Sequence, residues 1–397
     1  MKNASPNNAA VNAGPVLLPN ARLRYFEERK DEIVDVTRQF VEIESPSSLK
    51  QAVDRLSTIV RSRFEEIGGK ITVHRQKTAG NHLQISFPGN QEQKPVLILG
   101  HMDTVYPIGT LSKMHSKVEK GRLWGPGVLD MKAGIALIHA AMQALREWHK
   151  KRLPRPVHVL LVSDEEIGSQ TSRALTEGLA KKSAAVLVAE PAYGLQGAVK
   201  TARKGVGQYT LKVSGKAAHS GLDFEKGASA IIELSRQIIE ISRLVDLERG
   251  TTLNVGTIQG GGRVNVVPAE ASAVVDVRVT GKAEVADIDR KLRSLRPFNP
   301  QCKLEISGGM NRPPMERSSS TAQLYEKAQA IAAQLGWDLE EAAVGGGSDG
   351  NFTAALGIPT LDGLGPVGEG AHSSGENIVV DELPRRAALL AALIECV

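Results

Sequence analysis

VLILGHMDTV, residues 96–105, is the stretch from which the architecture of this chain can be worked out. Its opening apolar run is too short to cross a bilayer and is typical of a strand buried on both faces of a parallel sheet. The strand ends near His101, and Asp103 follows two residues later. Because side chains alternate along an extended backbone, both would point towards the crevice at the carboxyl ends of sheet strands. The pair suits a metal ligand and its orienting partner, although a histidine near a strand end is more often structural.

Composition limits the class of protein. The chain has 397 residues, more than one ordinary compact core, so two domains are expected. Hydrophobic residues make up 41% and charged residues 23%, as in globular proteins. The formal charge of +5 comes from scattered basic residues, and aromatic residues are only 4%, so we expect a solvated basic surface and no nucleic acid.

Cysteine usage and the N-terminus bear on the compartment. Cys302 and Cys396 are the only cysteines, which excludes a disulfide framework and a thiolate zinc site and fits a reducing cytoplasm. Residues 1–20 lack the apolar core of a signal peptide, and no stretch comes near the ~20 apolar residues of a membrane span. We therefore expect a cytoplasmic protein with no membrane partner and a disordered extension over residues 1–24.

Strands and helices alternate between residues 25 and 204. Apolar residues recur at helical spacing over 23–41, 51–67 and 131–148, and short apolar or alternating runs occur at 70–76, 81–87, 95–99, 157–162 and 184–189. This alternation predicts an α/β domain, a mostly parallel sheet flanked by helices.

After Pro191 the pattern changes. Strand-like segments at 207–214, 253–259, 271–279 and 303–307 are interleaved with helical patterns at 227–245 and 287–295. Two helices on one antiparallel sheet form an α+β two-layer sandwich of about a hundred residues, a size that folds as a unit. The α/β pattern resumes at 321–335 and ends at 383–394. We therefore expect residues 205–312 to be inserted between two parts of the larger domain, 25–204 and 313–397.

Acidic and histidine residues stand where the strands of the larger domain end. Asp130 lies in GPGVLDMKAG, residues 125–134, where a helix N-cap alone would explain it. Glu165 and Glu166 follow the strand at 157–162, and a buried strand seldom ends in crowded like charges without a cation to offset them. Glu190 follows the next strand. His372 comes after the glycine-rich GGGSDG, residues 345–350, which lacks the Lys-Ser/Thr ending of a phosphate loop.

These residues would meet, because the carboxyl ends of parallel strands lie at one edge of a sheet. Together they supply two imidazoles and several carboxylates. Nitrogen and oxygen donors without sulfur suit zinc, with manganese or cobalt as substitutes, and the number of carboxylates allows one to bridge two ions.

The motifs around these residues, in this order, resemble the co-catalytic zinc exopeptidases, the family of glutamate carboxypeptidase (carboxypeptidase G), aminoacylase, acetylornithine deacetylase and succinyl-diaminopimelate desuccinylase. The resemblance covers nearly the whole chain after residue 25. It implies two Zn²⁺ per subunit, held by His101, Asp130, Glu166, Glu190 and His372, with Asp130 as the bridge. It also implies a cis peptide bond between Asp130 and Met131.

The resemblance also implies catalytic roles. Asp103 would orient His101, and Glu165 would be the general base that takes a proton from the attacking water and returns it to the leaving amine. His219, in GKAAHS, residues 215–220, would stabilise the oxyanion, reaching across a homodimer into the partner's site. Taken alone, His219 is more often a surface histidine.

Three residues are expected to bind the substrate carboxylate. Asn265 and Arg278 match family positions, and Arg312, at the return to the larger domain, is a weaker candidate for the same task. An arginine suits it because the guanidinium fork pairs bidentately with a carboxylate. Arg278 could equally pair with Asp276 on its own strand. Lys200 and Lys204 receive no role.

We therefore predict a zinc metallo-exopeptidase, most like a glutamate carboxypeptidase, that hydrolyses the amide of an N-acyl amino acid or short peptide beside a free C-terminal carboxylate. The alternative is an aminoacylase or N-acyl-amino-acid deacetylase of the same fold. Tyr106, Pro107 and residues 345–350 favour the carboxypeptidase by resemblance only. A non-catalytic descendant that binds a ligand is a third interpretation, which Glu165 argues against because binding needs no general base.

Overall fold

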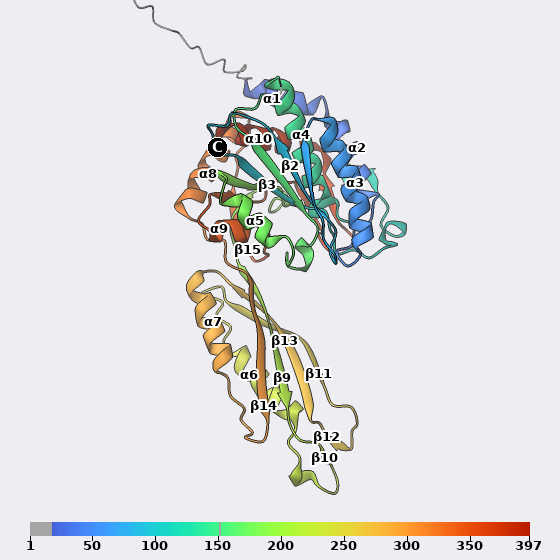
Figure 1. Cartoon of the computed structure of the whole chain (residues 1–397), viewed down its shortest axis with the longest axis vertical. Coiled ribbons are helices and arrows are strands. Elements are labelled where there is room, and N and C mark those ends of the chain that lie inside the picture. Colours follow the sequence, from blue (N-terminus) through green and yellow to red (C-terminus); the bar gives the residue numbers. More distant parts are fainter. Residues whose placement is uncertain (1–17, 151) are drawn as a thin grey trace, which may run out of the picture.

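The computed structural model describes residues 18–150 and 152–397 (Figure 1). Residues 1–17 of the expected N-terminal extension lie outside the described residues. The expectation of disorder was wrong for residues 19–24, because they begin helix α1 (Pro19–Glu27). Pro19 favours a helix start, and the buried Phe26 packs edge-on against Trp148, with ring centroids 5.8 Å apart. The single helix expected over 23–41 is therefore two, α1 and α2 (Lys30–Val41).

The larger domain is built around a six-stranded sheet of order β1-β2-β6-β3-β7-β16. Neighbouring strands from β6 to β16 run parallel, and β2 is antiparallel to both β1 and β6. The predicted α/β class with a mostly parallel sheet is confirmed. The strands are β1 (Lys70–His74), β2 (His82–Phe87), β3 (Val96–His101), β6 (Val157–Val162), β7 (Ala185–Val188) and β16 (Thr360–Leu361).

Strand β3 is buried on both faces, as its apolar run predicts. Val96 and Ile98 belong to the main core, whereas Leu97 and Leu99 belong to a second buried cluster on the opposite face. The main core is covered by helices α2, α3 (Lys50–Glu66), α4 (Ala133–Trp148), α8 (Ser319–Gln334) and α10 (Leu383–Cys396), and the second cluster by α5 (Arg173–Ala180) and α9 (Gly350–Ala355).

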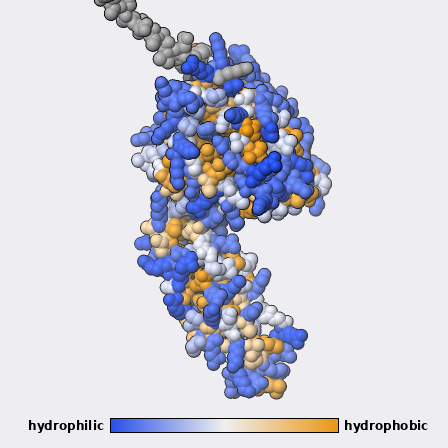
Figure 2. Space-filling view, viewed as in Figure 1, coloured by the Kyte–Doolittle hydropathy of each residue, from blue (hydrophilic) through white to orange (hydrophobic). Residues whose placement is uncertain are grey.

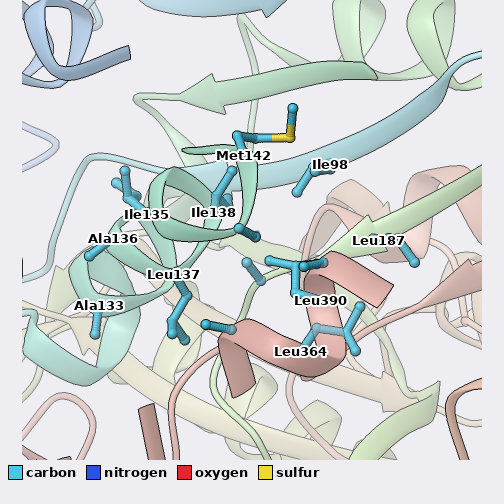
Figure 3. Close-up of a cluster of buried hydrophobic side chains, with 14 of the residues drawn as sticks. Ile98, Ala133, Ile135, Ala136, Leu137, Ile138, Met142, Leu187, Leu364 and Leu390 are labelled. Carbon is cyan, nitrogen blue, oxygen red and sulfur yellow. The ribbon is translucent and has the colours of Figure 1, made fainter. Parts of the chain in front are cut away.

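Helix α4 lies in the middle of the main core. Its Ile138 and Met142 share one buried cluster with Ile98 of β3 and Leu390 of α10 (Figure 3). The segment Val128–Trp148 is long and apolar enough to cross a membrane, contrary to the expectation that no stretch would come near that length. However, 83% of the most apolar 18-residue part of this segment is buried inside the domain, so a core helix explains its composition.

The smaller domain is a four-stranded antiparallel sheet of order β11-β13-β9-β14, with two helices on one face. Every second residue of β9 is buried, including Tyr209, Leu211 and Val213 beneath the helices. Figure 1 shows this domain extending away from the larger one. Its elements are β9 (Gly205–Ser214), α6 (Ala230–Ser242), β11 (Thr252–Gly260), β13 (Glu270–Val279), α7 (Lys282–Ser294) and β14 (Lys303–Arg312).

Short elements that the sequence pattern did not predict complete the fold. Two to five residues are too few to show a clear alternation. The strands are β4 (Lys117–Glu119), β5 (Arg122–Trp124), β8 (Val199–Arg203), β10 (Ala218–His219), β12 (Val266–Val267), β15 (Glu341–Val344), β17 (Gly368–Glu369) and β18 (Asn377–Val379). Helical turns lie at Thr110–Ser112, Glu165–Ile167, Phe224–Lys226 and Val380–Glu382. The segment Val128–Lys132 is kinked, with a non-helical backbone at Asp130 and Met131.

Candidate metal centre and catalytic site

The predicted ligands converge at one edge of the large sheet. His101 ends β3, Glu166 lies in the turn after β6, and Glu190 follows β7. Asp130 reaches the same place from the turn before α4, and His372 from the loop between β17 and β18. One nitrogen or oxygen atom each of His101, Asp130 and Glu166 lies within 4.8 Å of the others. Topology therefore assembles five side chains from five separate segments.

Asp130 lies between the two histidines. Its Oδ1 is 3.0 Å from Nε2 of His101, and its Oδ2 is 3.3 Å from Nε2 of His372. Glu190 Oε1 is 3.4 Å from His101 Nε2, and Glu166 Oε2 is 3.4 Å from His372 Nε2. The five residues thus form two groups that share Asp130: His101 with Glu190, and His372 with Glu166. The sequence had left open which glutamate belongs with which histidine.

The donor atoms fit two divalent cations. Ligands at ~2.0–2.1 Å from one ion in tetrahedral geometry lie roughly 3.3 Å apart, close to the separations above. Oε1 of Glu166 is buried without a hydrogen-bond partner in the described part of the chain, and buried polar atoms are seldom left unpaired. Imidazole and carboxylate donors without thiolate suit zinc, manganese or cobalt.

The charged groups of this cluster shift one another's pKa values. Hydrogen bonds to Asp130 and Glu166 raise the pKa of His372 to about 10. Burial alone would lower the pKa of His101, but Asp130 and Glu190 outweigh it and raise this pKa well above its usual value. Burial, with Asp130 nearby, raises the pKa of Glu190. The surplus of carboxylates over imidazoles therefore favours positive charge between them.

Asp103 contacts His101 through its main chain. Nδ1 of His101 lies 2.9 Å from the carbonyl oxygen of Asp103 and 3.6 Å from its Oδ1, so the main-chain oxygen is the hydrogen-bond partner. This contact leaves Nε2 facing Asp130 and Glu190. The Asp103 carboxylate instead accepts hydrogen bonds from Ser47 Oγ at 2.7 Å and from the N–H groups of Glu165 and Glu166 at 3.3 and 3.2 Å. It therefore holds the turn that carries both glutamates.

Glu165 lies beside the cluster in an ion-pair network. Nη2 of Arg312 is 2.7 Å from Oε1 of Glu165 and 3.1 Å from Oδ1 of Asp349. Burial raises the pKa of Glu165 well above its usual value, although Arg312 opposes this shift. Arg312 was expected to bind the substrate carboxylate, but its side chain is only 7% exposed and already pairs with these two acids. Asp349 was missed, because GGGSDG was interpreted as a turn.

The other predicted residues lie in the smaller domain, away from the cluster. His219 and Asn265 are neighbours at its far tip, where β10 pairs with β12 (Figure 1). The N–H groups of Gly221 and Leu222 donate to Nδ1 of His219 at 3.1 and 3.2 Å, which leaves Nε2 to carry the proton. One chain alone therefore does not bring His219 or Asn265 to the metal ligands.

Arg278 lies at the opposite end of the small sheet. It forms two hydrogen bonds to Asp276, at 2.8 and 2.9 Å, which is the alternative that the sequence left open. Arg278 and Arg312 each stand opposite Val206 of β9, on its two neighbouring strands. Residues in one cross-strand row share a face of the sheet. The two arginines therefore occupy one face at the end of the small sheet where β9 begins and β14 ends.

Glu376, which the sequence interpretation missed, holds the turn that carries Asp130. Its Oε1 accepts hydrogen bonds from the N–H groups of Leu129 and Asp130 at 2.8 and 2.9 Å, and its Oε2 from Gly127 at 3.1 Å. The peptide bond between Asp130 and Met131 is cis, as the resemblance implied. Glu376 follows His372 by four residues, so it connects the two loops that supply the shared ligand and one histidine.

The variant Glu376→Gln is expected to weaken metal binding by about 10–100-fold, the usual effect of removing an interaction that orients a ligand. The introduced amide would replace one acceptor oxygen with an NH2 donor, which would face at least one backbone N–H group of the Asp130 turn. Zn²⁺ affinity is measured by competition with a chelator. The control is Glu369→Gln, which removes an exposed ion pair with Arg122 and should leave the affinity unchanged. An unchanged Zn²⁺ affinity in a folded Glu376→Gln protein would contradict this role.

Buried positive charges border the Glu190 side of the cluster. Arg203 forms two hydrogen bonds to Asp362, at 2.7 and 2.9 Å, and its Nη2 lies 3.9 Å from Oε2 of Glu190. Burial, together with Arg203, lowers the pKa of Lys200 to about 8. We call this the cationic side of the cluster.

A sheet edge that gathers two histidines and two glutamates around a shared aspartate, with a further buried carboxyl group alongside, defines a hydrolase with a dinuclear metal site. The chain belongs to peptidase family M20/M25/M40, whose family model matches residues 97–395. It is therefore a hydrolytic metallopeptidase.

Two relatives and one solved structure show what this member of the peptidase family is similar to. Carboxypeptidase G2 of Pseudomonas sp. (strain RS-16) is 29% identical over 395 residues, which cover 96% of this chain and 94% of the relative. Acetylornithine deacetylase of Myxococcus xanthus is 28% identical, over 75% of this chain and 78% of the relative. A tripeptidase from Staphylococcus aureus superposes with a TM-score of 0.78 at 21% identity, covering 92% and 98% of the two chains, and shows the shared fold.

Proposed function

We propose that the protein is a zinc-dependent carboxypeptidase that hydrolyses the amide bond of N-acyl amino acids or short peptides beside a free C-terminal carboxylate. One observation carries this proposal: Asp130 bridges two His–Glu pairs, and the buried Glu165 lies next to them. The similarity to carboxypeptidase G2 along nearly the whole chain supports the choice of a carboxypeptidase.

In this mechanism the chain's own residues position the reactants and move the proton. Divalent cations held by the two ligand groups, when bound, would lower the pKa of water to about 7 and polarise the amide carbonyl. Glu165 takes the proton of the attacking water and delivers it to the leaving nitrogen. A raised pKa suits this task, because the carboxyl group must keep the proton between the two steps. Arg312 and Asp103 hold Glu165 from opposite ends, by its carboxylate and by its backbone N–H.

The substrate carboxylate would bind on the cationic side of the cluster. Lys200 and Arg203 lie there; both are buried and Arg203 is paired with Asp362, so they would attract the carboxylate through their charge. Arg312 would have to leave Glu165 and Asp349 to reach the substrate. Such a carboxylate would be recognised by charge and by bidentate geometry. Asn265 and Arg278 keep the substrate-binding role that the resemblance implies.

We further propose a homodimer in the cytoplasm, in which His219 and Asn265 act in the site of the partner copy. The tip that carries them is far from the metal ligands of its own chain (Figure 1). The Nε2–H group of His219 suits a developing oxyanion, to which it can donate a hydrogen bond. Figure 2 shows apolar surface at the far end of the smaller domain, where Leu222 and Phe224 are exposed. Exposed apolar groups of this kind favour contact with another protein surface.

The test is a hydrolysis screen of the metal-loaded protein with and without chelator. We expect release of glutamate or a similar amino acid from acyl and peptidyl substrates, loss of activity with chelator, and recovery with Zn²⁺, Mn²⁺ or Co²⁺. An N-acyl-amino-acid deacetylase is the second candidate, favoured by the similarity to acetylornithine deacetylase. Activity on acetylated substrates with none on C-terminal glutamates would select it. No chelator-sensitive hydrolysis of either kind would overturn the proposal.

A further inference from the structure

A cavity of about 470 Å³ opens beside His372, and no catalytic step above uses it. Its walls are the loop from Tyr106 to Met114 and the residues His372 to Ser374. The volume falls within the range of small-molecule sites, about 300–1,000 Å³. Because Asp130 separates His372 from His101 and Glu190, this cavity lies at the opposite end of the cluster from Lys200 and Arg203.

The walls of the cavity are held in place by hydrogen bonds. The Glu44 carboxylate accepts from the N–H groups of Gly109 and Leu111, both at 2.8 Å. The hydroxyl group of Tyr106 donates to the carbonyl oxygen of Ser373 at 3.0 Å and also contacts Glu376. One wall is therefore tied to the other and to the residue that holds the Asp130 turn. A preformed cavity loses little conformational entropy when a ligand binds.

The lining is apolar with one cation at the rim. Pro107 and Ile108 present exposed apolar side chains, with Ile108 50% exposed, and Met114 forms part of the lining from within the domain. Lys113 is exposed at the same cavity and has no ion-pair partner among residues 18–150 and 152–397. Apolar walls favour a hydrocarbon chain, and the unpaired ammonium group favours an anion at its far end.

We propose that this cavity is the acyl subsite of the enzyme, and that it takes an extended acyl chain, preferably one that ends in a second carboxylate near Lys113. This inference rests on the proposed function and adds the class of acyl group to it. The amino-acid carboxylate is drawn to the cationic side of the cluster, so the acyl chain leaves the scissile carbonyl towards His372. Ile108 contacts the chain along its length, and Lys113 pairs with its end.

The experiment compares N-acetyl-, N-hexanoyl- and N-adipoylglutamate on the metal-loaded protein. Ile108→Asp is expected to lower kcat/KM for the hexanoyl substrate by about tenfold, the effect of losing an apolar pocket contact, and to spare the acetyl substrate. Lys113→Gln is expected to lower the ratio of kcat/KM for the adipoyl substrate to kcat/KM for the hexanoyl substrate by about threefold, the effect of losing an exposed ion pair. The control is Val118→Asp, which changes an equally exposed apolar residue on β4 outside the cavity.

Two results would overturn the acyl subsite. One is that Ile108→Asp lowers kcat/KM for all three substrates equally, which indicates a displaced loop. The other is that Ile108→Asp changes kcat/KM for none of them. A binding measurement separates this failure from failure of the proposed function. Calorimetry compares N-acetyl- and N-hexanoylglutamate on the wild-type protein and on Ile108→Asp. Suppose that the wild-type protein hydrolyses neither compound but binds the hexanoyl compound more tightly, and that Ile108→Asp abolishes this preference. This result would support the acyl subsite and reject the proposed activity. Equal affinities of the wild-type protein for both compounds would reject the acyl subsite.

Discussion

Replacing Glu165 by glutamine should lower kcat/KM by about 10²–10⁴-fold, the usual contribution of a general acid–base group. Glutamine keeps the shape of the side chain and can still accept a hydrogen bond from Arg312, but it cannot take up a proton. Glu165 is not a member of the two His–Glu pairs, so the protein should still bind two metal ions. Steady-state kinetics and metal analysis of the same preparation test both statements.

The matched control for this variant is Glu66→Gln, an exposed glutamate at the end of α3, which should leave kcat/KM unchanged. Thermal unfolding of Glu165→Gln excludes a general loss of structure. If the variant bound two metal ions and hydrolysed its substrate at the wild-type rate, Glu165 would not be the base, and the proposed mechanism would be lost with it.

The second large effect is expected for Asp130→Ala. The two carboxylate oxygens of Asp130 each face one histidine of the cluster, His101 at 3.0 Å and His372 at 3.3 Å. Its loss removes one ligand from each of the two proposed metal sites. We expect the metal content to fall from two ions to at most one, and activity to fall by several orders of magnitude, because the paired cations act on one water and one carbonyl.

Metal content is measured by elemental analysis after dialysis against buffered Zn²⁺, and activity on the same samples. Asp381→Ala, which removes an exposed ion pair with Lys30, serves as the control for the loss of an aspartate. Circular dichroism shows whether Asp130→Ala remains folded. A folded variant that retained two tightly bound ions would show that Asp130 is not the bridge.

Periodicity and strand ends allowed much of this protein to be predicted. The apolar residues 96–99 require a strand with neighbours on both faces, and Val96 and Leu97 do belong to separate buried clusters. His101, Glu166 and Glu190 follow strands, so their convergence follows from the parallel sheet. His372 was expected beside them, but it lies on a loop between two short strands, so its place does not follow from the parallel sheet.

Residues whose role depends on contacts far along the chain were not predictable in this way. Glu376 looks like any acidic loop residue until its carboxylate is seen to accept three backbone N–H groups 246 to 249 positions away. Arg312 was assigned to a substrate carboxylate, yet Glu165 and Asp349 occupy its guanidinium group. No local pattern records which anion lies nearest to an arginine.

The order of apolar and polar residues along this chain was sufficient for its α/β class, its two kinds of sheet and the donor types of its metal site, because these depend on local periodicity and on side-chain chemistry. The pairing of His101 with Glu190 and of His372 with Glu166, the ion pairs of Glu165, and the cavity beside His372 came from the folded chain alone. They depend on spatial distances between segments that lie up to hundreds of residues apart in the sequence. The packing of the sheet and its loops sets those distances.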